Sequence, residues 1–294
     1  MTSPPSWRVS TVVPAAAVTS FEAAFASLCD AVACFEAGGD AWRIDGTCRL
    51  PPDATELDIA CRLAAAATGL APPAVRITPI DDRDWVAAVN AQLPPVRAGR
   101  FLVYGRHHRA TLAVRPGEIG LAIDAGLAFG TGHHASTEGC LLALSRLARR
   151  PVRRALDLGC GSGILAIAIA KQWHARVVAA DIDPRAVATA RENARHNGVG
   201  PLIRCLAADG ISGGVSQLAP YDLIVANILA SPLRRLAGAV CAHLAVPGRL
   251  ILAGFLESDR RLVGKAYAAR GLRPLFGLRL GEWTTLVFER AVPG

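Results

Sequence analysis

The sequence comprises 294 residues, of which 52% are hydrophobic, so it can bury the core of one large domain and a smaller companion. Basic residues outnumber acidic ones by 32 to 24, but the first 95 residues carry 6 basic and 11 acidic side chains, whereas the rest carry 26 and 13. The most apolar later stretch, Ile164 to Ala170, is too short to span a bilayer, which excludes a membrane-spanning helix there.

Eight cysteines are spread along the chain with no C-x-x-C pair and without the dense spacing of a disulfide framework. We therefore expect buried free thiols in a reducing, cytoplasmic environment. The apolar run from Val12 to Ala17 follows no basic segment, so no export signal is predicted and no membrane association is expected.

Residues 1–80 predict a small domain that mixes helices and strands. Its expected strands and helices are Trp7–Val13 (strand), Ser20–Glu36 (helix), Ala41–Leu50 (strand), Pro51–Thr68 (helix) and Ala74–Ile80 (strand). This pattern suits an α+β sandwich of a ferredoxin-like variant. The acidic balance indicates either a substrate-recognition surface for a basic protein or an ordinary solvated face.

A linker is expected between the two domains, over residues 81–96. The segment Asp81–Asn90 predicts a short helix with acids in its first turn, and Pro94 and Pro95 end it. Residues 97–294 then form the larger domain.

Two strands, Arg100–Tyr104 and Ile119–Ile123, are expected to enter this larger domain, with His107 and His108 between them. Adjacent side chains point to different sides of a strand or loop and rarely chelate one metal ion, so these histidines are interpreted as solvated loop residues.

The segment from Leu127 to Cys140 is rich in glycine and predicts a flexible loop that can fold over a bound ligand. Ser136 or Thr137 is expected to cap the helix that continues from Cys140 to Leu147. An ordinary connection with a helix cap is the alternative. No carboxylate or cysteine is expected to complete a metal site with the histidines of this segment, so no metal is expected.

The stretch from Arg154 to Asp183 combines an apolar run, a glycine-dense turn, an apolar helix and a second apolar run, which predicts a nucleotide-binding strand-turn-helix-strand unit. Gly159, Gly161 and Gly163 lack a Cβ atom, so a ligand can approach the backbone closely, at the positive end of the helix dipole. Asp181 ends the second strand 22 residues after Gly159, where an acid can bind ribose hydroxyl groups.

Two cofactors fit this unit. A dinucleotide fingerprint is present as Gly161-x-Gly163-x-x-Ala166, and the acidic, glycine-rich loop of S-adenosylmethionine methyltransferases is present from Asp157 to Gly163. Asp157 favours S-adenosylmethionine, because an acid at the mouth of the strand suits a cationic amino group and is a poor neighbour for a pyrophosphate. The remaining alternative is that the glycines only shape a tight turn.

The rest of the chain alternates helices and strands, which predicts an α/β fold with a doubly wound, Rossmann-like sheet of the S-adenosylmethionine methyltransferase type. The expected helices and strands are Pro184–Asn197, Leu202–Ala207, Tyr221–Asn227, Pro232–Leu244, Arg249–Ala253 and Asp259–Ala269. Asp209 follows one strand and either contacts an adenine amino group or is solvated. Asn227 stands at the carboxyl end of another, where open sheets bind ligands.

Five segments together resemble the PrmA family, the methyltransferases of the eleventh protein of the large ribosomal subunit. They are residues 128–134 (Ala-Phe-Gly-Thr-Gly-His-His), 156–166 (Leu-Asp-Leu-Gly-Cys-Gly-Ser-Gly-Ile-Leu-Ala), 181–184 (Asp-Ile-Asp-Pro), 197–199 (Asn-Gly-Val) and 226–230 (Ala-Asn-Ile-Leu-Ala). The second segment alone indicates a class I methyltransferase, whereas the first and last are much more specific to the family. The resemblance covers about residues 81–294.

This resemblance implies that four residues contact S-adenosylmethionine: Thr137, Gly159, Asp181 and Asn227. The loop chemistry described above adds Asp157 and Gly161 to the expected cofactor-binding residues. In one departure, Ala135-Ser136-Thr137 stands where the family usually has Pro-Thr-Thr or Glu-Thr-Thr, which leaves the matched threonine in place.

The resemblance also implies methyl transfer to lysine ε-amino and N-terminal α-amino groups of a large-subunit ribosomal protein. Asn227 is the expected catalytic residue, because its side-chain carbonyl can accept an N–H from the amine and direct the nitrogen lone pair at the methyl group. No dedicated base is evident, so water is the expected proton acceptor.

Other functions fit part of the pattern. An RNA base methyltransferase would share the cofactor unit, but Ile228 and Leu229 stand where such enzymes carry a stacking aromatic residue. Another protein-lysine methyltransferase, a nicotinamide oxidoreductase and a non-catalytic ribosome-binding module are further alternatives. The basic charge of the larger domain allows contact with ribosomal RNA.

Overall fold

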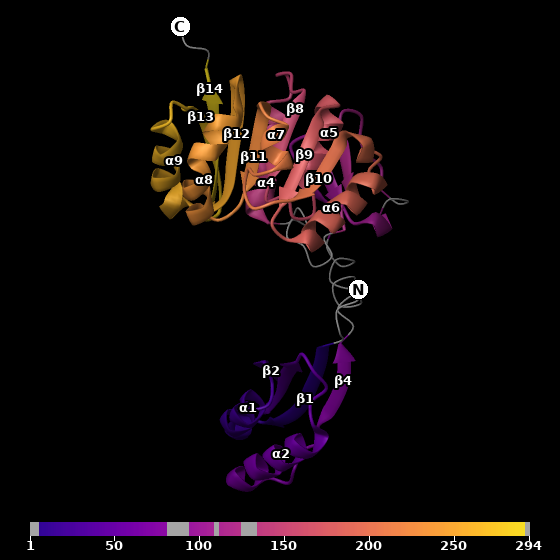
Figure 1. The fold of residues 1–294 in the computed structure, drawn as a ribbon. Coiled ribbons are helices and arrows are strands. Elements are labelled where there is room, and N and C mark those ends of the chain that lie inside the picture. The colour runs from indigo at the N-terminus through magenta and orange to yellow at the C-terminus, as the bar shows by residue number, and fades with distance from the viewer. Residues whose placement is uncertain (1–5, 81–93, 109–111, 125–133, 292–294) are drawn as a thin grey trace. The chain divides into compact units, whose positions relative to one another are not determined.

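The computed structural model describes four parts of the chain, residues 6–80, 94–108, 112–124 and 134–291 (Figure 1). The chain divides into two compact units, Met1–Ala87 and Ala88–Gly294. The division falls within the predicted linker, whose expected helix lies outside the described residues, as does most of the predicted glycine-rich loop.

Unit 1 is a four-stranded antiparallel sheet with two helices. Its regular elements are β1 (Ser6–Pro14), α1 (Val18–Ala26), β2 (Ala31–Gly38), β3 (Ala41–Cys48), α2 (Ala54–Thr68) and β4 (Arg76–Ile80). The βαββαβ order along the chain and the strand order β2-β3-β1-β4 are those of a ferredoxin-like fold, as predicted.

The first helix of unit 1 is shorter than predicted, because a strand follows it. We expected one helix from Ser20 to Glu36, but α1 ends at Ala26 and β2 begins at Ala31. Asp30 fixes the turn between them: its backbone N–H donates to the carbonyl of Thr47, and its carboxylate accepts from the N–H of Arg49 (2.7 Å). These bonds to the end of β3 align the apolar run after Asp30 as a strand.

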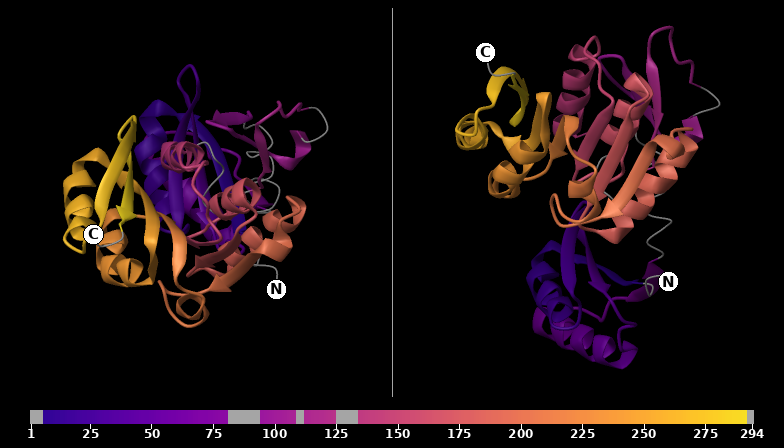
Figure 2. Two further views of the ribbon diagram at one scale, coloured as in Figure 1. Left: turned by 90° about the horizontal axis from the view of Figure 1, so that it is seen from above. Right: turned by 45° about the horizontal axis from the view of Figure 1, so that its top comes forward.

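Unit 2 contains a seven-stranded sheet with the order β10-β9-β8-β11-β12-β14-β13. Its strands are β8 (Arg154–Leu158), β9 (Arg176–Asp181), β10 (Ile203–Ala207), β11 (Tyr221–Asn227), β12 (Leu244–Leu256), β13 (Arg273–Leu280) and β14 (Trp283–Arg290). All neighbours are parallel except β14, which is antiparallel to β12 and β13. Figure 2 shows the yellow pair β13 and β14 beside the orange strand β12.

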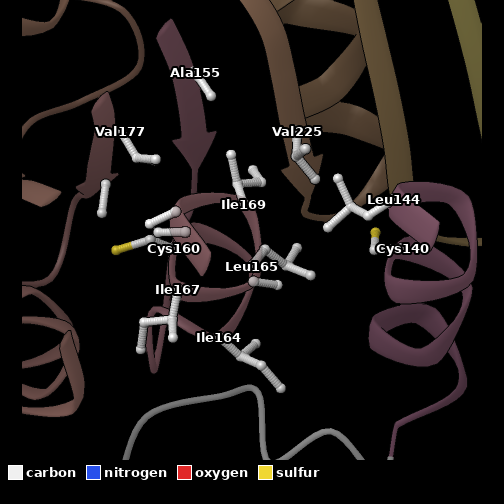
Figure 3. Close-up of a cluster of buried hydrophobic side chains, with 14 of the residues drawn as sticks. Cys140, Leu144, Ala155, Cys160, Ile164, Leu165, Ile167, Ile169, Val177 and Val225 are labelled. Atoms are coloured by element: carbon white, nitrogen blue, oxygen red, sulfur yellow. The ribbon is translucent and has the colours of Figure 1, made fainter. Parts of the chain in front are cut away.

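Helices cover both faces of this sheet. They are α4 (Ala135–Arg146), α5 (Ile164–Trp173), α6 (Pro184–His196), α7 (Gly214–Gln217), α8 (Ala230–His243) and α9 (Arg260–Ala268). Side chains alternate between two cores: Ala155 of β8 packs with α4, α5 and α6, and the next residue, Leu156, packs with α7, α8 and α9. Figure 3 shows part of the first core, where Ile164, Leu165 and Ile169 of α5 are drawn. The predicted doubly wound sheet is therefore confirmed.

A separate three-stranded sheet, β5 (Val96–Ala98), β6 (Phe101–Tyr104) and β7 (Ile119–Ala122), precedes the large one, which confirms the two strands predicted here. Polar side chains of α5 and of the end of α6 form hydrogen bonds that join this small sheet to the helices. The Lys171 ammonium group donates to the carbonyl of Gly120 (2.6 Å) and to Asn197 Oδ1 (2.8 Å). Asn197 Nδ2 in turn donates to the carbonyl of Ala122 (2.7 Å).

All eight cysteines are free thiols; six are buried, as predicted, and Cys29 and Cys34 are half-buried. Among the described residues, no helix is long and apolar enough to cross a membrane.

Candidate active site

A cavity of about 480 Å³ lies at the carboxyl ends of β8, β9 and β11. The strand order reverses at this point, since β9 and β10 lie on one side of β8 and β11 and β12 on the other. Open α/β sheets bind ligands where the order reverses, and this volume is typical of a small-molecule site. Five of the six predicted site residues line the cavity: Thr137, Gly159, Gly161, Asp181 and Asn227.

The glycine loop after β8 forms one wall. The N–H groups of Gly159 and Cys160 both donate to the carbonyl of Ala180 in β9 (2.8 and 3.0 Å), which folds the loop back over the neighbouring strand. Gly159 has φ +74°, and a Cβ atom there would lie 2.3 Å from the side chain of Ile228. Only glycine therefore fits this turn without displacing the side chain of Ile228, which follows β11.

Asp181 lies at the end of β9, and its carboxylate holds the loop in place. One oxygen accepts the N–H of Gly161 (2.9 Å) and the other accepts the N–H of Asp183 (3.0 Å). A carboxylate has about four lone-pair sites, so each oxygen can accept a further hydrogen bond from a ligand hydroxyl in the cavity. Its position fits the ribose-binding role predicted for it.

Asp157 lies beneath the glycine loop and does not line the cavity, in contrast to our expectation. Its side chain is 1% exposed and accepts the N–H of Ala166 in α5 (2.9 Å) through Oδ2. Oδ1 is buried with no hydrogen-bond partner in the described part of the chain. Burial raises the pKa of this carboxyl to about 7, and the negative charge of Asp181 adds to the rise. Asp157 points into the core because it lies on the same face of β8 as Ala155, two residues earlier.

Asn227, the last residue of β11, presents an unsatisfied acceptor at the cavity. Its Nδ2 donates to Thr137 Oγ1 (3.2 Å), which fixes the amide plane. Its Oδ1 is buried and has no partner among the described residues. A buried acceptor without a hydrogen bond costs about 1–3 kcal/mol, so such an atom marks a place where a ligand donor can bind.

The chain after Asn227 is held close to β12. The N–H of Ile228 donates to the carbonyl of Ala253 (3.1 Å). Gly254, which follows Ala253 in β12, has φ +88°, and a Cβ atom there would lie 2.7 Å from the backbone N and O of Ile228. This close approach fixes the direction in which the Asn227 side chain leaves the strand.

The N-cap of α4 differs from the prediction. The helix begins at Ala135, and the cap is His134, whose Nδ1 accepts the N–H of Ser136 (3.3 Å). Ser136 and Thr137 are fully buried in the first turn. His133 and the glycines before it lie outside the described residues.

Sequence reasoning gave no site role to several residues that line the cavity, among them His134, Arg235 and Trp283. The rings of His134 and Trp283 meet edge to face, with their centroids 4.3 Å apart, and burial lowers the pKa of His134. Trp283 begins β14, far along the chain from every motif, so no spacing could identify it. Asp209, whose role the sequence left open, also lines the cavity.

His107 and His108 lie in a short turn of 3-10 helix after β6, with their rings 4.1 Å apart and His107 exposed. This agrees with their interpretation as loop residues. In the parts of the chain that the structure describes, no group of three or more His, Cys, Asp or Glu side chains could hold a metal ion.

Comparisons with known proteins point to one family. The model of the ribosomal protein L11 methyltransferase (PrmA) family matches residues 36–291. The ribosomal protein L11 methyltransferase of Rhizobium leguminosarum bv. trifolii is 50% identical over 213 residues, 72% of each chain. That of Rhodopseudomonas palustris is 43% identical over 263 residues, 88% of each chain.

A solved structure agrees with these relatives. The crystal structure of ribosomal protein L11 methylase from Lactobacillus delbrueckii subsp. bulgaricus is 28% identical to this chain, with a TM-score of 0.62. The match covers 68% of this chain and 100% of that one.

Replacing Asp181 by Ala should weaken the binding of S-adenosylmethionine about 10-fold or more, because ribose hydrogen bonds are lost and the N–H of Gly161 loses its acceptor. Titration calorimetry measures this change. The matched control is Asp183→Ala, which removes an acid that does not line the cavity and should change the affinity less than threefold. Unchanged affinity in Asp181→Ala would contradict the site.

The buried carboxyl of Asp157 predicts a pH dependence of stability. Its pKa is about 7 in the folded chain and 3.8 ordinarily, so the folded state retains a proton that the unfolded state has lost, and stability falls as the pH rises from about 4 to 7. Between pH 5 and 8, the free energy of unfolding should fall by about 2–3 kcal/mol more in the wild type than in Asp157→Asn.

Urea denaturation at the two pH values tests this prediction. The control is Asp183→Asn, since the bond with Arg185 holds the pKa of that exposed carboxyl below its ordinary value, outside this pH range. It should keep the wild-type dependence. An identical dependence in wild type and Asp157→Asn would show that the Asp157 carboxyl titrates normally.

Proposed function

Because the chain belongs to the ribosomal protein L11 methyltransferase family and is an S-adenosylmethionine-dependent protein methyltransferase, we propose that its substrate is ribosomal protein L11. The proposed acceptors are lysine ε-amino groups and the N-terminal α-amino group of that protein, and the proposed location is the cytoplasm. Contact with ribosomal RNA is a further part of the proposal.

The residues of the cavity suit S-adenosylmethionine. Asp181 offers acceptors for the ribose hydroxyl groups, and the following Ile182 gives an apolar wall for the adenine ring. Asp209 lies on the same wall, where its carboxylate can accept from the adenine amino group. Gly159 and Gly161 leave the backbone accessible to the amino-acid part of the cofactor. The proposed cofactor-binding set is completed by Thr137 and Asn227.

Asp157 takes an indirect part in this proposal. Since its carboxylate accepts the N–H of Ala166 in the first turn of α5, it fixes the start of that helix relative to β8. The glycine loop joins these two elements. Asp157 is therefore proposed as a positioning residue for the loop.

The observation that carries the proposed catalytic role is the unsatisfied Oδ1 of Asn227. When bound, S-adenosylmethionine supplies an electrophilic methyl group, and transfer requires the acceptor nitrogen to lie in line with it at about 3–3.5 Å. Asn227 Oδ1 can accept one N–H of the amine and so direct its lone pair. Thr137 keeps the amide in that orientation through its bond to Nδ2.

The acceptor amine must be uncharged to attack. This is easier for an α-amino group, with a pKa of about 7.7–8.0, than for a lysine side chain, with a pKa of about 10.4. Burial lowers the pKa of His134, which favours the neutral ring and so reduces its repulsion of an incoming ammonium group. The ring of Trp283 beside it can attract such a cation through its π face.

Unit 1 is proposed to select the substrate. Residues 1–80 contain no catalytic constellation, and the acidic balance of the first 95 residues suits a basic ribosomal protein. On α2, Ile59 and Leu63 lie one turn apart and are 53% and 67% exposed, which gives the unit an apolar contact surface with acids beside it. An RNA base methyltransferase is not favoured, because the exposed Leu229 after Asn227 offers no aromatic face for a base.

Asn227→Ala should lower the single-turnover rate of methylation about 100-fold or more while it changes the affinity for S-adenosylmethionine less than about fivefold. The rate falls because the amine loses its acceptor. Rapid quench measures the rate and calorimetry the affinity. Asn227→Asp keeps an acceptor oxygen and should retain more of the rate than the alanine variant. Equal losses of rate and affinity would make Asn227 a cofactor contact only.

Phe25→Ala tests the role of unit 1. This side chain is 0% exposed in the core of the small unit, and its loss should destabilise that unit by about 3–5 kcal/mol. L11 methylation should fall at least 10-fold at temperatures where unit 1 is unfolded, with the affinity for S-adenosylmethionine retained. Phe35→Ala, at a side chain that is 46% exposed, is the control. Full activity on L11 with unit 1 unfolded would contradict its role in substrate selection.

A further inference from the structure

Arginines gather at the amino end of the seven-stranded sheet, the end opposite to the cavity. Arg154 and Arg176 are the first residues of β8 and β9 and lie opposite each other in the parallel register. Arg204 on β10 lies opposite Val178, two residues after Arg176. Because side chains alternate along a strand, all three arginines project to the face that carries α7, α8 and α9, and all three are exposed.

Two adjacent hollows surround these arginines. One, of about 500 Å³, is lined by Arg154, Arg176 and Arg204, and the other, of about 480 Å³, is lined by Arg191, Arg195 and Arg204. Both share Arg204, so the five arginines form one continuous group, the arginine cluster. It wraps the edge strand β10, which lies beside α6 (Figure 1).

The charge of the arginine cluster is uncompensated. Within the described residues, neither hollow is lined by an acid, and no member of the cluster forms an ion pair. By contrast, Arg185, Arg260 and Arg273 elsewhere in unit 2 each pair with a carboxylate. Arg191 donates to the carbonyl of Cys205 at 3.4 Å.

The positive field continues along the same end of the sheet. Burial and the nearby charge of Arg150 lower the pKa of Arg249 on β12. Two described carboxylates lie near this end: Asp222 accepts the backbone N–H groups of Arg153 and Arg154. Glu289, opposite Arg249 in the sheet, pairs with Arg273. A surface of this kind concentrates anions.

We propose that the arginine cluster binds the phosphate backbone of RNA. Neighbouring strands lie about 4.8 Å apart, so the long, exposed side chains of Arg154 and Arg176 can reach neighbouring phosphates of a nucleic acid strand. Guanidinium groups match phosphate oxygens in bidentate geometry and stay charged at all physiological pH values. Since the group curves over both faces of β10, it suits an extended polyanion better than one small anion.

This site is separate from methyl transfer. The cavity lies at the carboxyl ends of the strands and the arginine cluster at their amino ends, so bound RNA leaves the cofactor site open. The inference rests on the proposed contact with ribosomal RNA and locates it, but it does not depend on the proposed protein substrate. It gives the enzyme a surface that holds ribosomal RNA while the amine of a ribosomal protein is presented elsewhere.

Fluorescence anisotropy with a labelled 20-base-pair RNA duplex tests the proposal on the full chain. The triple variant Arg154→Gln, Arg176→Gln, Arg204→Gln should bind at least 10-fold more weakly at 150 mM KCl. The slope of log Kd against log salt should fall by about 2–3, because each lost phosphate contact removes about 0.9. A second variant, Arg191→Gln with Arg195→Gln, should lose affinity in the same direction.

The matched control removes the same charge from α9 and the turn after it: Arg260→Gln, Arg261→Gln, Arg270→Gln. It should lose less than threefold, and calorimetry should give wild-type affinity for S-adenosylmethionine in every variant, which also shows that unit 2 is folded. An equal loss of RNA affinity in the control would show that net charge alone explains the effect, and would overturn the proposed site. No binding by the wild type, or equal competition by polyglutamate of matched charge, would overturn the assignment to RNA.

Discussion

The site depends on the carboxylate of Asp181, which holds together the loops that follow two neighbouring strands. Asp181 ends β9 and accepts backbone N–H groups from the glycine loop after β8 and from its own following turn. This bond fixes the loop against the neighbouring strand at the point where the strand order reverses. The loop lines one side of the cavity because these hydrogen bonds keep it next to β9.

The other acid of the motif illustrates how environment separates two similar side chains. Asp157 faces the core under α5, where burial raises the pKa of its carboxyl to about 7, whereas Asp181 lies half-buried at the cavity. The buried carboxyl of Asp157 can anchor the start of α5, and the half-buried carboxylate of Asp181 can bind a ligand. One motif therefore supplies a structural acid and a binding acid.

Two asparagines, one within α6 and one directly after it, connect the glycine loop to the rest of unit 2. Asn193 is buried, and its Nδ2 donates both to the carbonyl of Ser162 in the glycine loop (2.9 Å) and to that of Asp124 after β7 (2.8 Å). Asn197, one turn later, binds the end of β7 itself. The chain that enters unit 2 is thus fastened to the loop that forms the cavity.

Much of this arrangement could be predicted from the sequence, because glycine spacing and apolar periodicity are local. The doubly wound sheet and the positions of Gly159, Asp181 and Asn227 at one edge follow from them. The strand β2 was missed because its apolar run continues that of α1, and only pairing with β3 separates the two.

Long-range contacts explain the other differences. The position of Trp283 depends on the return of β14 to the sheet beside β12. The inward direction of Asp157 depends on which face of β8 α5 covers. No local pattern contains this information.

The central claim is that this chain methylates amines of a protein at the edge of the sheet marked by Asn227. Intact mass spectrometry of L11, after incubation with the full chain and S-adenosylmethionine, tests it most directly. The account predicts mass increments of whole methyl groups on L11 that fragmentation assigns to lysine side chains or the α-amine. Methyl groups found on ribosomal RNA, with L11 unmodified, would contradict it.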